Sequence, residues 1–247
     1  MKSWAILSDL QISYHDPVVV NTALSFVEQL KPDGVILNGD VVDCYSISKF
    51  NHDPLQPETL DREIKQAGKI MDRLSKCGAK ELWWLGGNHE DRLRKYVWSN
   101  SEMFKLSTGL LDHVRFPSLF NLQHYGFRWK DYGKGVWLGK LFVTHGSIVR
   151  KHSAETARAH FAKYGVSVLV GHTHRLGAYY HTDMGGPSVA YENGCLCRLD
   201  PEYEQHPDWQ HGFSIAHVDP VTKRFHVDQI PILRRTMIIY GGKKYVY

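Results

Sequence analysis

Five short apolar runs in this chain each lead directly into a polar segment, and this recurrence constrains the fold more than any other feature. The polar segments are Asp9–Gln11, Gly39-Asp40, Gly87-Asn88-His89, Thr144-His145-Gly146 and Gly171-His172-Thr173-His174. Each apolar run is short, rich in β-branched or aromatic residues and ended by glycine or a polar residue, which predicts a buried strand. Because the carboxyl ends of the strands in an open α/β sheet face one crevice, the five segments should converge there.

The residue types in these segments indicate a two-metal hydrolase. Carboxylate, amide and imidazole groups are the ligands of divalent ions that polarise a phosphoryl oxygen, and a bridging carboxylate holds two ions about 3.5–4 Å apart. Asp40 is the natural bridge. An alternative interpretation, that the clusters are solvated loop tips, leaves their repeated position behind strands unexplained.

The order and content of the segments resemble the calcineurin-like metallophosphoesterase superfamily, whose pattern runs D-x-H, G-D, G-N-H-D/E, G-H and G-H-x-H over roughly residues 4–198. The resemblance implies an α/β fold, a four-layer α/β/β/α sandwich of two mixed sheets with outer helices, as a single domain over residues 1–247. It also implies two divalent ions. One would be held by Asp9, Asp40 and His174, and the other by Asp40, Asn88, His145 and His172. An extended backbone would send His172 and His174 to the same face.

Gln11 departs from the family pattern, which usually has histidine at this position. Its amide oxygen is neutral and harder than imidazole, so the Asp9 site should bind its ion more weakly and prefer Mn²⁺ or Mg²⁺ to zinc or iron. The Asp-x-Gln form resembles that of phage-type relatives. Two alternatives stay open: Gln11 ligates nothing, or His15 takes its place. We expect Mn²⁺ in both sites, with Mg²⁺, Zn²⁺ or iron as alternatives.

By the same resemblance His89 is the catalytic histidine, and Asp43 is the carboxylate that orients it. A cap for the following segment is the alternative role of Asp43. In the phosphoprotein phosphatases an arginine follows this aspartate, whereas this chain has Cys44. Arg92 and Arg175 are the first candidates for substrate binding. Other basic residues near the motifs could also bind a phosphate or a nucleic-acid backbone, and for these and for Arg92 an exposed helix surface is the alternative: Arg94, Lys95, Arg150, Lys151 and His152.

Composition limits the possible class and location of the protein. The chain has 247 residues, 43% of them hydrophobic, and a net charge of +4, which is too small to indicate nucleic-acid binding. No apolar run approaches the ~20 residues needed to cross a bilayer, and the first residues lack a secretory pattern, so we expect a cytoplasmic protein without membrane contact. Four cysteines are too few for a disulfide scaffold, and the thiols of Cys195 and Cys197 should point to opposite sides.

Periodicity predicts the remaining elements. Helices are expected over 17–30, over 57–77 beginning with Pro57 and Glu58, and over most of 90–112, with two or three strands in 124–143. After His174 the period changes to two, which predicts a second, antiparallel-rich sheet built from Tyr179–Thr182, Ser188–Glu192, Phe213–Val218 and Arg224–Val227. Asn193-Gly194-Cys195 resembles the turn that closes the family's second sheet.

The sequence therefore predicts a metal-dependent phosphoesterase that uses a hydroxide bridging two ions. Its substrate would be a phosphodiester or phosphomonoester of nucleotide or nucleic-acid type, with a nuclease-like diesterase slightly preferred. Two alternatives remain: a catalytically weak scaffold that uses the same fold for binding, which Gln11 supports, and a phosphoprotein phosphatase, which Gln11 and Cys44 disfavour.

Overall fold

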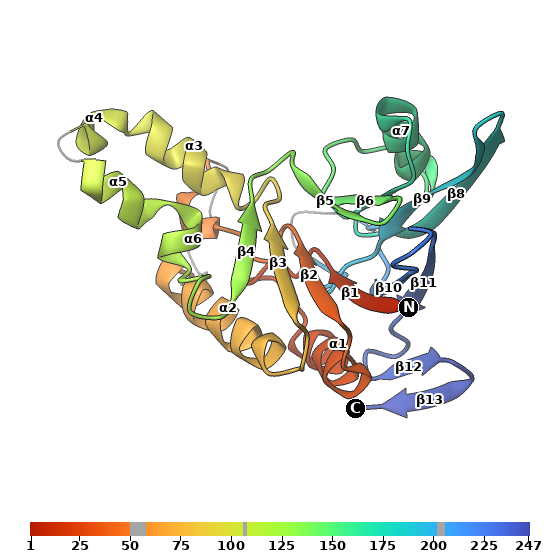
Figure 1. Cartoon of the computed structure of the whole chain (residues 1–247). Helices are drawn as coiled ribbons and strands as arrows, with labels where there is room; N and C mark the ends of the chain where they lie inside the picture. Colours follow the sequence, from red (N-terminus) through yellow and green to blue (C-terminus); the bar gives the residue numbers. More distant parts are fainter. Residues whose placement is uncertain (50–57, 106–107, 202–205) are drawn as a thin grey trace.

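Two mixed β-sheets form the centre of the molecule (Figure 1). This computed structural model describes residues 1–49, 58–105, 108–201 and 206–247. The first sheet has the order β11-β10-β1-β2-β3-β4, in which β1 to β4 are parallel neighbours and β10 and β11 are antiparallel. Its strands are β1 (Lys2–Leu7), β2 (Gly34–Asn38), β3 (Glu81–Leu85), β4 (Phe127–Lys130), β10 (Gly212–Val218) and β11 (Phe225–Pro231).

The second sheet has the order β5-β6-β7-β9-β8. Strands β6, β7 and β9 are parallel, and β5 and β8 add antiparallel edges. The strands are β5 (Gly135–Leu138), β6 (Leu141–Thr144), β7 (Val168–Val170), β8 (Leu176–Asp183) and β9 (Gly186–Asn193). Two or three strands were predicted for 124–143, and β4, β5 and β6 confirm that prediction.

The two-residue period of the strands separates the core into layers. In β1, Ala5 and Leu7 face the outer core with α1 (Pro17–Leu30) and α2 (Leu60–Ser75), whereas Trp4 and Ile6 face the second sheet. Within the second sheet, Leu169 faces inward and its neighbours in β7 pack with α7 (Glu155–Tyr164) on the outer side. The predicted α/β/β/α sandwich is therefore confirmed.

Local chemistry explains where the two long helices begin. Asp16 caps α1, because its carboxylate accepts from the backbone N–H groups of Val18 and Val19, and Pro17 occupies the first turn. Thr59 caps α2 by accepting from the N–H of Arg62, so the helix begins at Leu60 and ends at Ser75, inside the predicted 57–77. Pro57 lies outside the described residues.

The predicted helical segment 90–112 is broken into short helices. They are α3 (Asp91–Ser99), α4 (Ser101–Phe104) and α5 (Thr108–Val114), and α6 (Phe116–Leu119) follows. Figure 1 shows them as an arm beside β4, at the opposite end of the molecule from β8 and β9.

One topological prediction was wrong. Strands β10 and β11 were expected in the second sheet, but β10 pairs with β1 in the first sheet. Alternation identifies a strand and its buried face, but both sheets bury one face against the same inner core, so the pattern does not say which sheet the strand joins.

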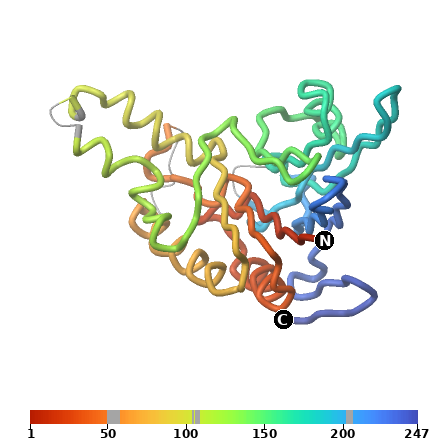
Figure 2. Tube along the Cα trace, in the orientation of Figure 1, coloured from red at the N-terminus to blue at the C-terminus, as the bar shows by residue number. Residues whose placement is uncertain are grey.

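The end of the chain covers α1. The hairpin β12 (Met237–Tyr240) and β13 (Lys243–Val246) lies beside this helix (Figure 2), and the rings of Tyr240 and Tyr245 meet Phe26 edge-on at centroid distances of 5.5 and 5.2 Å. Across the described residues, every helix is too short or too polar to cross a membrane.

Candidate metal centre

The loops that follow β1, β2, β3, β6 and β7 bring the predicted ligands together. Backbone hydrogen bonds join the first two loops: the N–H of Asp9 donates to the carbonyl of Gly39 at 3.0 Å, and that of Gln11 donates to Asp40 at 2.8 Å. The N–H of His172 reaches across from the second sheet to the Asp9 carboxylate at 3.0–3.1 Å. The centre thus uses strand ends from both sheets, rather than the crevice of one open sheet.

Most of the predicted ligands have an unusual backbone. Five of the seven have φ between 48° and 73°, in the left-handed region: Asp9, Gln11, Asp40, His172 and His174. Non-glycine residues rarely adopt this region, and when several do so at one place the strain points to function. The expected extended backbone at His172 and His174 was wrong. A left-handed turn, and not a strand, directs each of these rings.

One group of ligand atoms surrounds Asp40. His145 Nε2 lies 3.1 Å from Asp40 Oδ2 and 3.3 Å from Asn88 Oδ1. His172 joins this group, because the potential ligand atoms of Asp40, His145 and His172 all lie within 4.8 Å of one another. His145 Nδ1–H donates to the carbonyl of Asn38 at 2.8 Å, which leaves Nε2 as the ligand atom. Two ligands about 2.1 Å from one ion are roughly 3.0–3.4 Å apart, so these spacings fit a shared ion.

The Asp40 carboxylate supports this interpretation. It is fully buried, and its Oδ2 makes no hydrogen bond of good geometry although His145 is close. Burial opposes ionisation, but the His145 and His89 rings hold the pKa of Asp40 well below its usual range. A Cβ on Gly87 would lie 2.1 Å from Asp40 Oδ1, so only glycine lets the next loop come this close. A buried anion with an unsatisfied oxygen fits a cation.

A second group lies around Asp9. His174 Nε2 is 3.3 Å from Asp9 Oδ1 and 3.2 Å from Gln11 Nε2. The Gln11 amide thus lies beside this group with its nitrogen toward His174, and a half-turn of the amide would direct its oxygen to the same point. His15, the alternative, pairs with Cys197 as an isolated bridge, and its Nδ1 is buried without a hydrogen-bond partner.

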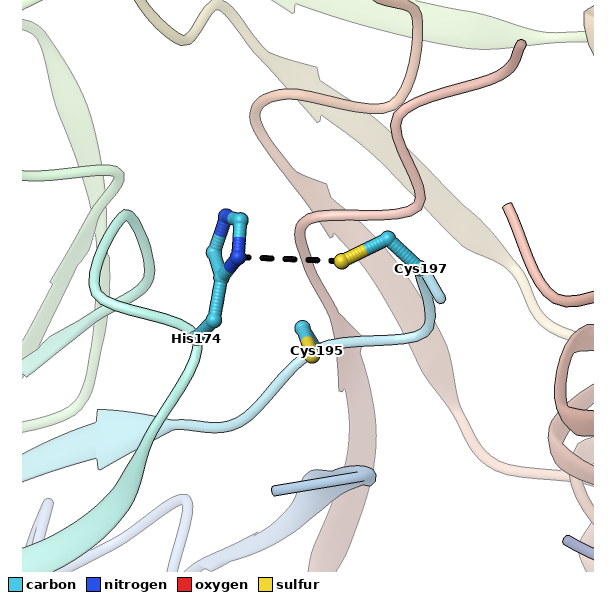
Figure 3. A group of neighbouring side chains, drawn as sticks. All are labelled: His174, Cys195 and Cys197. Carbon is cyan, nitrogen blue, oxygen red and sulfur yellow. Dashed lines mark hydrogen bonds between the residues drawn. The ribbon is translucent and has the colours of Figure 1, made fainter. Parts of the chain in front are cut away.

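Two cysteines lie behind His174 (Figure 3). Cys197 Sγ is 3.6 Å from His174 Nδ1, and Cys195 joins them in a fully buried cluster. All four cysteines are free, as predicted, but the expected divergence of the Cys195 and Cys197 thiols was wrong, because residues two apart in extended chain share a face. Since His174 Nε2 faces Asp9, the sulfur of Cys197 serves as the partner of Nδ1 and fixes the ring.

His89 faces the cluster from the β3 loop. Its Nδ1 lies 2.6 Å from Asp43 Oδ1, and its Nε2 lies 3.7 Å from Asp40 Oδ2. Burial would lower the pKa of His89, but Asp40 and Asp43 raise it above the ordinary value. The structure does not use Asp43 as a cap: Cys44 precedes the 3₁₀ turn η1 (Tyr45–Ile47) and makes no side-chain capping bond.

Comparison with known proteins decides the family. The sequence model of the calcineurin-like phosphoesterases matches residues 4–176. The chain belongs to this family. It is also similar to the Gene 54 proteins of two phages: 26% identical over 234 residues to that of Mycobacterium phage D29, and 25% over 237 residues to that of Mycobacterium phage L5. Each alignment covers 88% of this chain and 89% of the relative.

Solved structures of similar topology include a Vps29 single mutant from Entamoeba histolytica, with a TM-score of 0.49, 10% identity and 99% of each chain covered. Another is a dimetal phosphatase from Danio rerio, with a TM-score of 0.48, 12% identity and coverage of 100% of this chain and 99% of that chain. Family membership makes this calcineurin-like phosphoesterase a metal-dependent hydrolase of phosphoester bonds.

Two buried glutamates brace the loops of the phosphoesterase site, and sequence reasoning missed both. Glu90 accepts from the N–H groups of Asp40, Val41 and Gly87 at 2.7–2.9 Å and so ties the β2 loop to the β3 loop. Glu63 of α2 holds the chain beyond Asp43 by accepting from the two following N–H groups at 2.6 and 2.9 Å. Glu90 belongs to the Gly-Asn-His-Glu motif, whereas an amphipathic helix gives no signal that Glu63 points inward.

The predicted substrate arginines have different surroundings. Arg92 NH1 donates to Asp43 Oδ2 at 3.0 Å, and its NH2 lies 3.4 Å from His89 Nε2, so its guanidinium is part of the site. Arg175 is buried, and its terminal nitrogens donate to the backbone carbonyls of Arg150 and Lys151, which holds that loop. Arg94 and Lys95 pair with Asp91 on α3, as expected for a helix surface, and residues 150–152 are exposed.

We predict that Glu90→Gln weakens ion binding although Glu90 is not itself a proposed ligand, because its carboxylate holds the backbone of Asp40. The amide offers one acceptor oxygen in place of two, and each buried N–H left without an acceptor costs about 1–3 kcal/mol, so stability should fall by about 2 kcal/mol or more. Calorimetry with Mn²⁺ should show weaker binding by at least tenfold, and urea unfolding gives the stability. Glu81→Gln, at the surface end of β3, is the control. Unchanged affinity would show that Glu90 does not position Asp40.

We also predict that Gln11 determines the metal preference of the Asp9 site. Gln11→His should tighten Zn²⁺ at that site relative to Mn²⁺, and Gln11→Ala should weaken one ion while the Asn88–His145 site keeps its own. Titrations of each metal into metal-free protein, followed by bound-metal analysis, measure both effects. Gln123→His, in an exposed turn, controls for an added imidazole. Superimposable titrations of wild type and both Gln11 variants would exclude Gln11 as a ligand.

Proposed function

We propose that the protein is a dinuclear phosphodiesterase that acts on esters of nucleotide or nucleic-acid type. The observation that carries this proposal is the side-by-side placement of the two ligand groups. The backbone of His172 donates to Asp9 of one group while its ring lies 5.3 Å from the ring of His145 in the other. Asp40 is the proposed bridge, and one domain over residues 1–247, placed in the cytoplasm, is proposed to contain the whole site.

The ligand residues fit two divalent ions. Asp9, Gln11, Asp40 and His174 would hold one, and Asp40, Asn88, His145 and His172 the other. When bound, such ions neutralise the charge that develops on the phosphoryl oxygens and lower the pKa of water between them. The oxygen-rich set around Asp9 supports Mn²⁺ as the native ion, with Mg²⁺ next.

The protein's own side chains complete the reaction. His89 is proposed to protonate the leaving oxygen from Nε2, because that atom faces Asp40 while Nδ1 is held by Asp43. Arg92 lies beside this nitrogen and is proposed to bind a non-bridging phosphoryl oxygen through a charge-assisted hydrogen bond. Asp43 thus fixes both groups that act on the substrate.

Asp40→Asn tests the dinuclear arrangement. Since Asp40 is the one residue proposed to contact both ions, its replacement should abolish hydrolysis of bis-aryl phosphodiesters and lower bound metal at both positions. Metal analysis after dialysis against Mn²⁺ measures the second effect. Asp61→Asn, on the exposed face of α2, is the control. A variant that retains two bound ions and full activity would exclude the proposed bridge.

His89→Ala should keep fold and metal content while losing rate by about 10²–10⁴-fold, the usual contribution of a general acid. An aryl leaving group of low pKa needs less protonation than an alkoxide, so its hydrolysis should suffer less. Steady-state rates on aryl and alkyl diesters measure this difference, with the exposed His226→Ala as control. Equal losses on both substrates would instead assign charge stabilisation to His89.

A further inference from the structure

A cleft of about 600 Å³ opens between α3, α5, α6 and the loop after β4. This volume lies within the range of small-molecule sites, about 300–1,000 Å³. Figure 1 shows these helices as the arm on the side of β4. The walls are mostly apolar and include Leu93, Val97, Leu111, Val114, Phe116 and Trp129.

The cleft adjoins the metal centre through Gly86 and Tyr132, which also line it. Gly86 is the first residue after β3, two residues before Asn88. A Cβ added to Gly86 would lie 2.9–3.0 Å from the Trp129 ring and from the backbone of Tyr132. The Tyr132 ring is 6.4 Å from the His145 ring. A molecule in the cleft would therefore lie beside the loops that carry Asn88 and His145.

The rim of the cleft combines an exposed aromatic ring with charged side chains of both signs, among them Arg94, Arg115, Asp91 and Asp131. The Trp98 side chain is 63% exposed, and the Arg94 guanidinium lies 4.2 Å from its ring centroid. Arg115 lies on the rim contributed by the loop between α5 and α6. Nucleobases stack on aromatic side chains, and arginine contributes to such sites, so Trp98 with Arg94 beside it offers a stacking surface for a base. Arg94 pairs with Asp91 and Arg115 with Asp112, so the exposed stacking ring, and not the net charge of the rim, carries the argument.

We propose that this cleft binds the base of a nucleotide whose phosphodiester lies at the metal centre. This inference rests on the proposed phosphodiesterase function and adds the substrate's recognition element. In this proposal the Trp98 ring stacks on the base, and the apolar residues at the floor of the cleft exclude water from the edge of the base. Tyr132 lies between the base in the cleft and the phosphate at the metal centre. The cleft recognises the planar ring of a base and does not discriminate between bases, because every base can stack on an aromatic side chain.

Two dinucleotides that differ only in their bases test the proposal. Thymidylyl-thymidine is compared with the same diester in which tetrahydrofuran sugars carry no base, and kcat/KM is measured for each with Mn²⁺-loaded protein. We expect wild type to prefer the base-containing diester by at least about tenfold, as expected for one stacked base. Trp98→Ala should remove most of this preference. Trp137→Ala, which removes an equally exposed tryptophan from β5, should retain it.

A binding measurement separates this inference from the proposed function. Calorimetry compares thymidine 5′-monophosphate with deoxyribose 5-phosphate, for wild type and for Trp98→Ala. Base-dependent binding that Trp98→Ala removes supports the cleft even if neither dinucleotide is hydrolysed, an outcome that would overturn only the phosphodiesterase. Hydrolysis of both dinucleotides at equal kcat/KM, or a base preference that survives in Trp98→Ala, overturns the cleft and leaves the phosphodiesterase intact. Failure of hydrolysis together with base-independent binding overturns both.

Discussion

The geometry of the site depends on one buried carboxylate, that of Glu90. It is 2% exposed and accepts hydrogen bonds from four backbone N–H groups of two different loops, and from the indole N–H of Trp84 at 3.3 Å. An anion in the interior is tolerated only with such partners, because desolvation without them costs several kcal/mol. The same bonds fix Asp40 relative to Asn88, so the ligands of one ion are preorganised before it binds.

The strained backbone of the ligand residues and the hydrogen bonds that hold it occur together in this site. Each left-handed non-glycine residue costs of order 1–3 kcal/mol, and Asp9, Asp40 and His174 all adopt this conformation. The hydrogen bonds between the first two loops, and those of Asp9 with the His172 backbone, hold these residues in place. The buried strands below supply a rigid support. Precision therefore comes from loops that the sheets and carboxylates hold together.

The side of the site that would face substrate is separate from the ligand groups. Asp43 joins His89 and Arg92 in one hydrogen-bonded unit, so the proton donor and the proposed phosphate contact share an anchor. Arg175 has the same charge but supports the loop after β6. The cleft below α3 extends this side away from the ions, and its aromatic rim differs from the charged surroundings of His89. The residues proposed for ion binding, for proton transfer and for substrate recognition thus come from different elements.

The sequence alone determined the strands, the order of the polar segments and the family, because short apolar runs ended by ligand residues are local patterns. It also predicted the pairing of Asp43 with His89, which the structure shows at 2.6 Å, and singled out Gln11 as the departure from the family pattern. Tertiary structure decided what local patterns cannot contain. Strands β10 and β11 joined the first sheet through pairing with β1, which is far away in sequence. Glu63 and Glu90 became braces, and Cys197 met His174, because burial and distance depend on the packed chain. The cleft exists only where three separate stretches of the chain meet, residues 86–98, 111–117 and 129–132, so no single stretch of sequence encodes it.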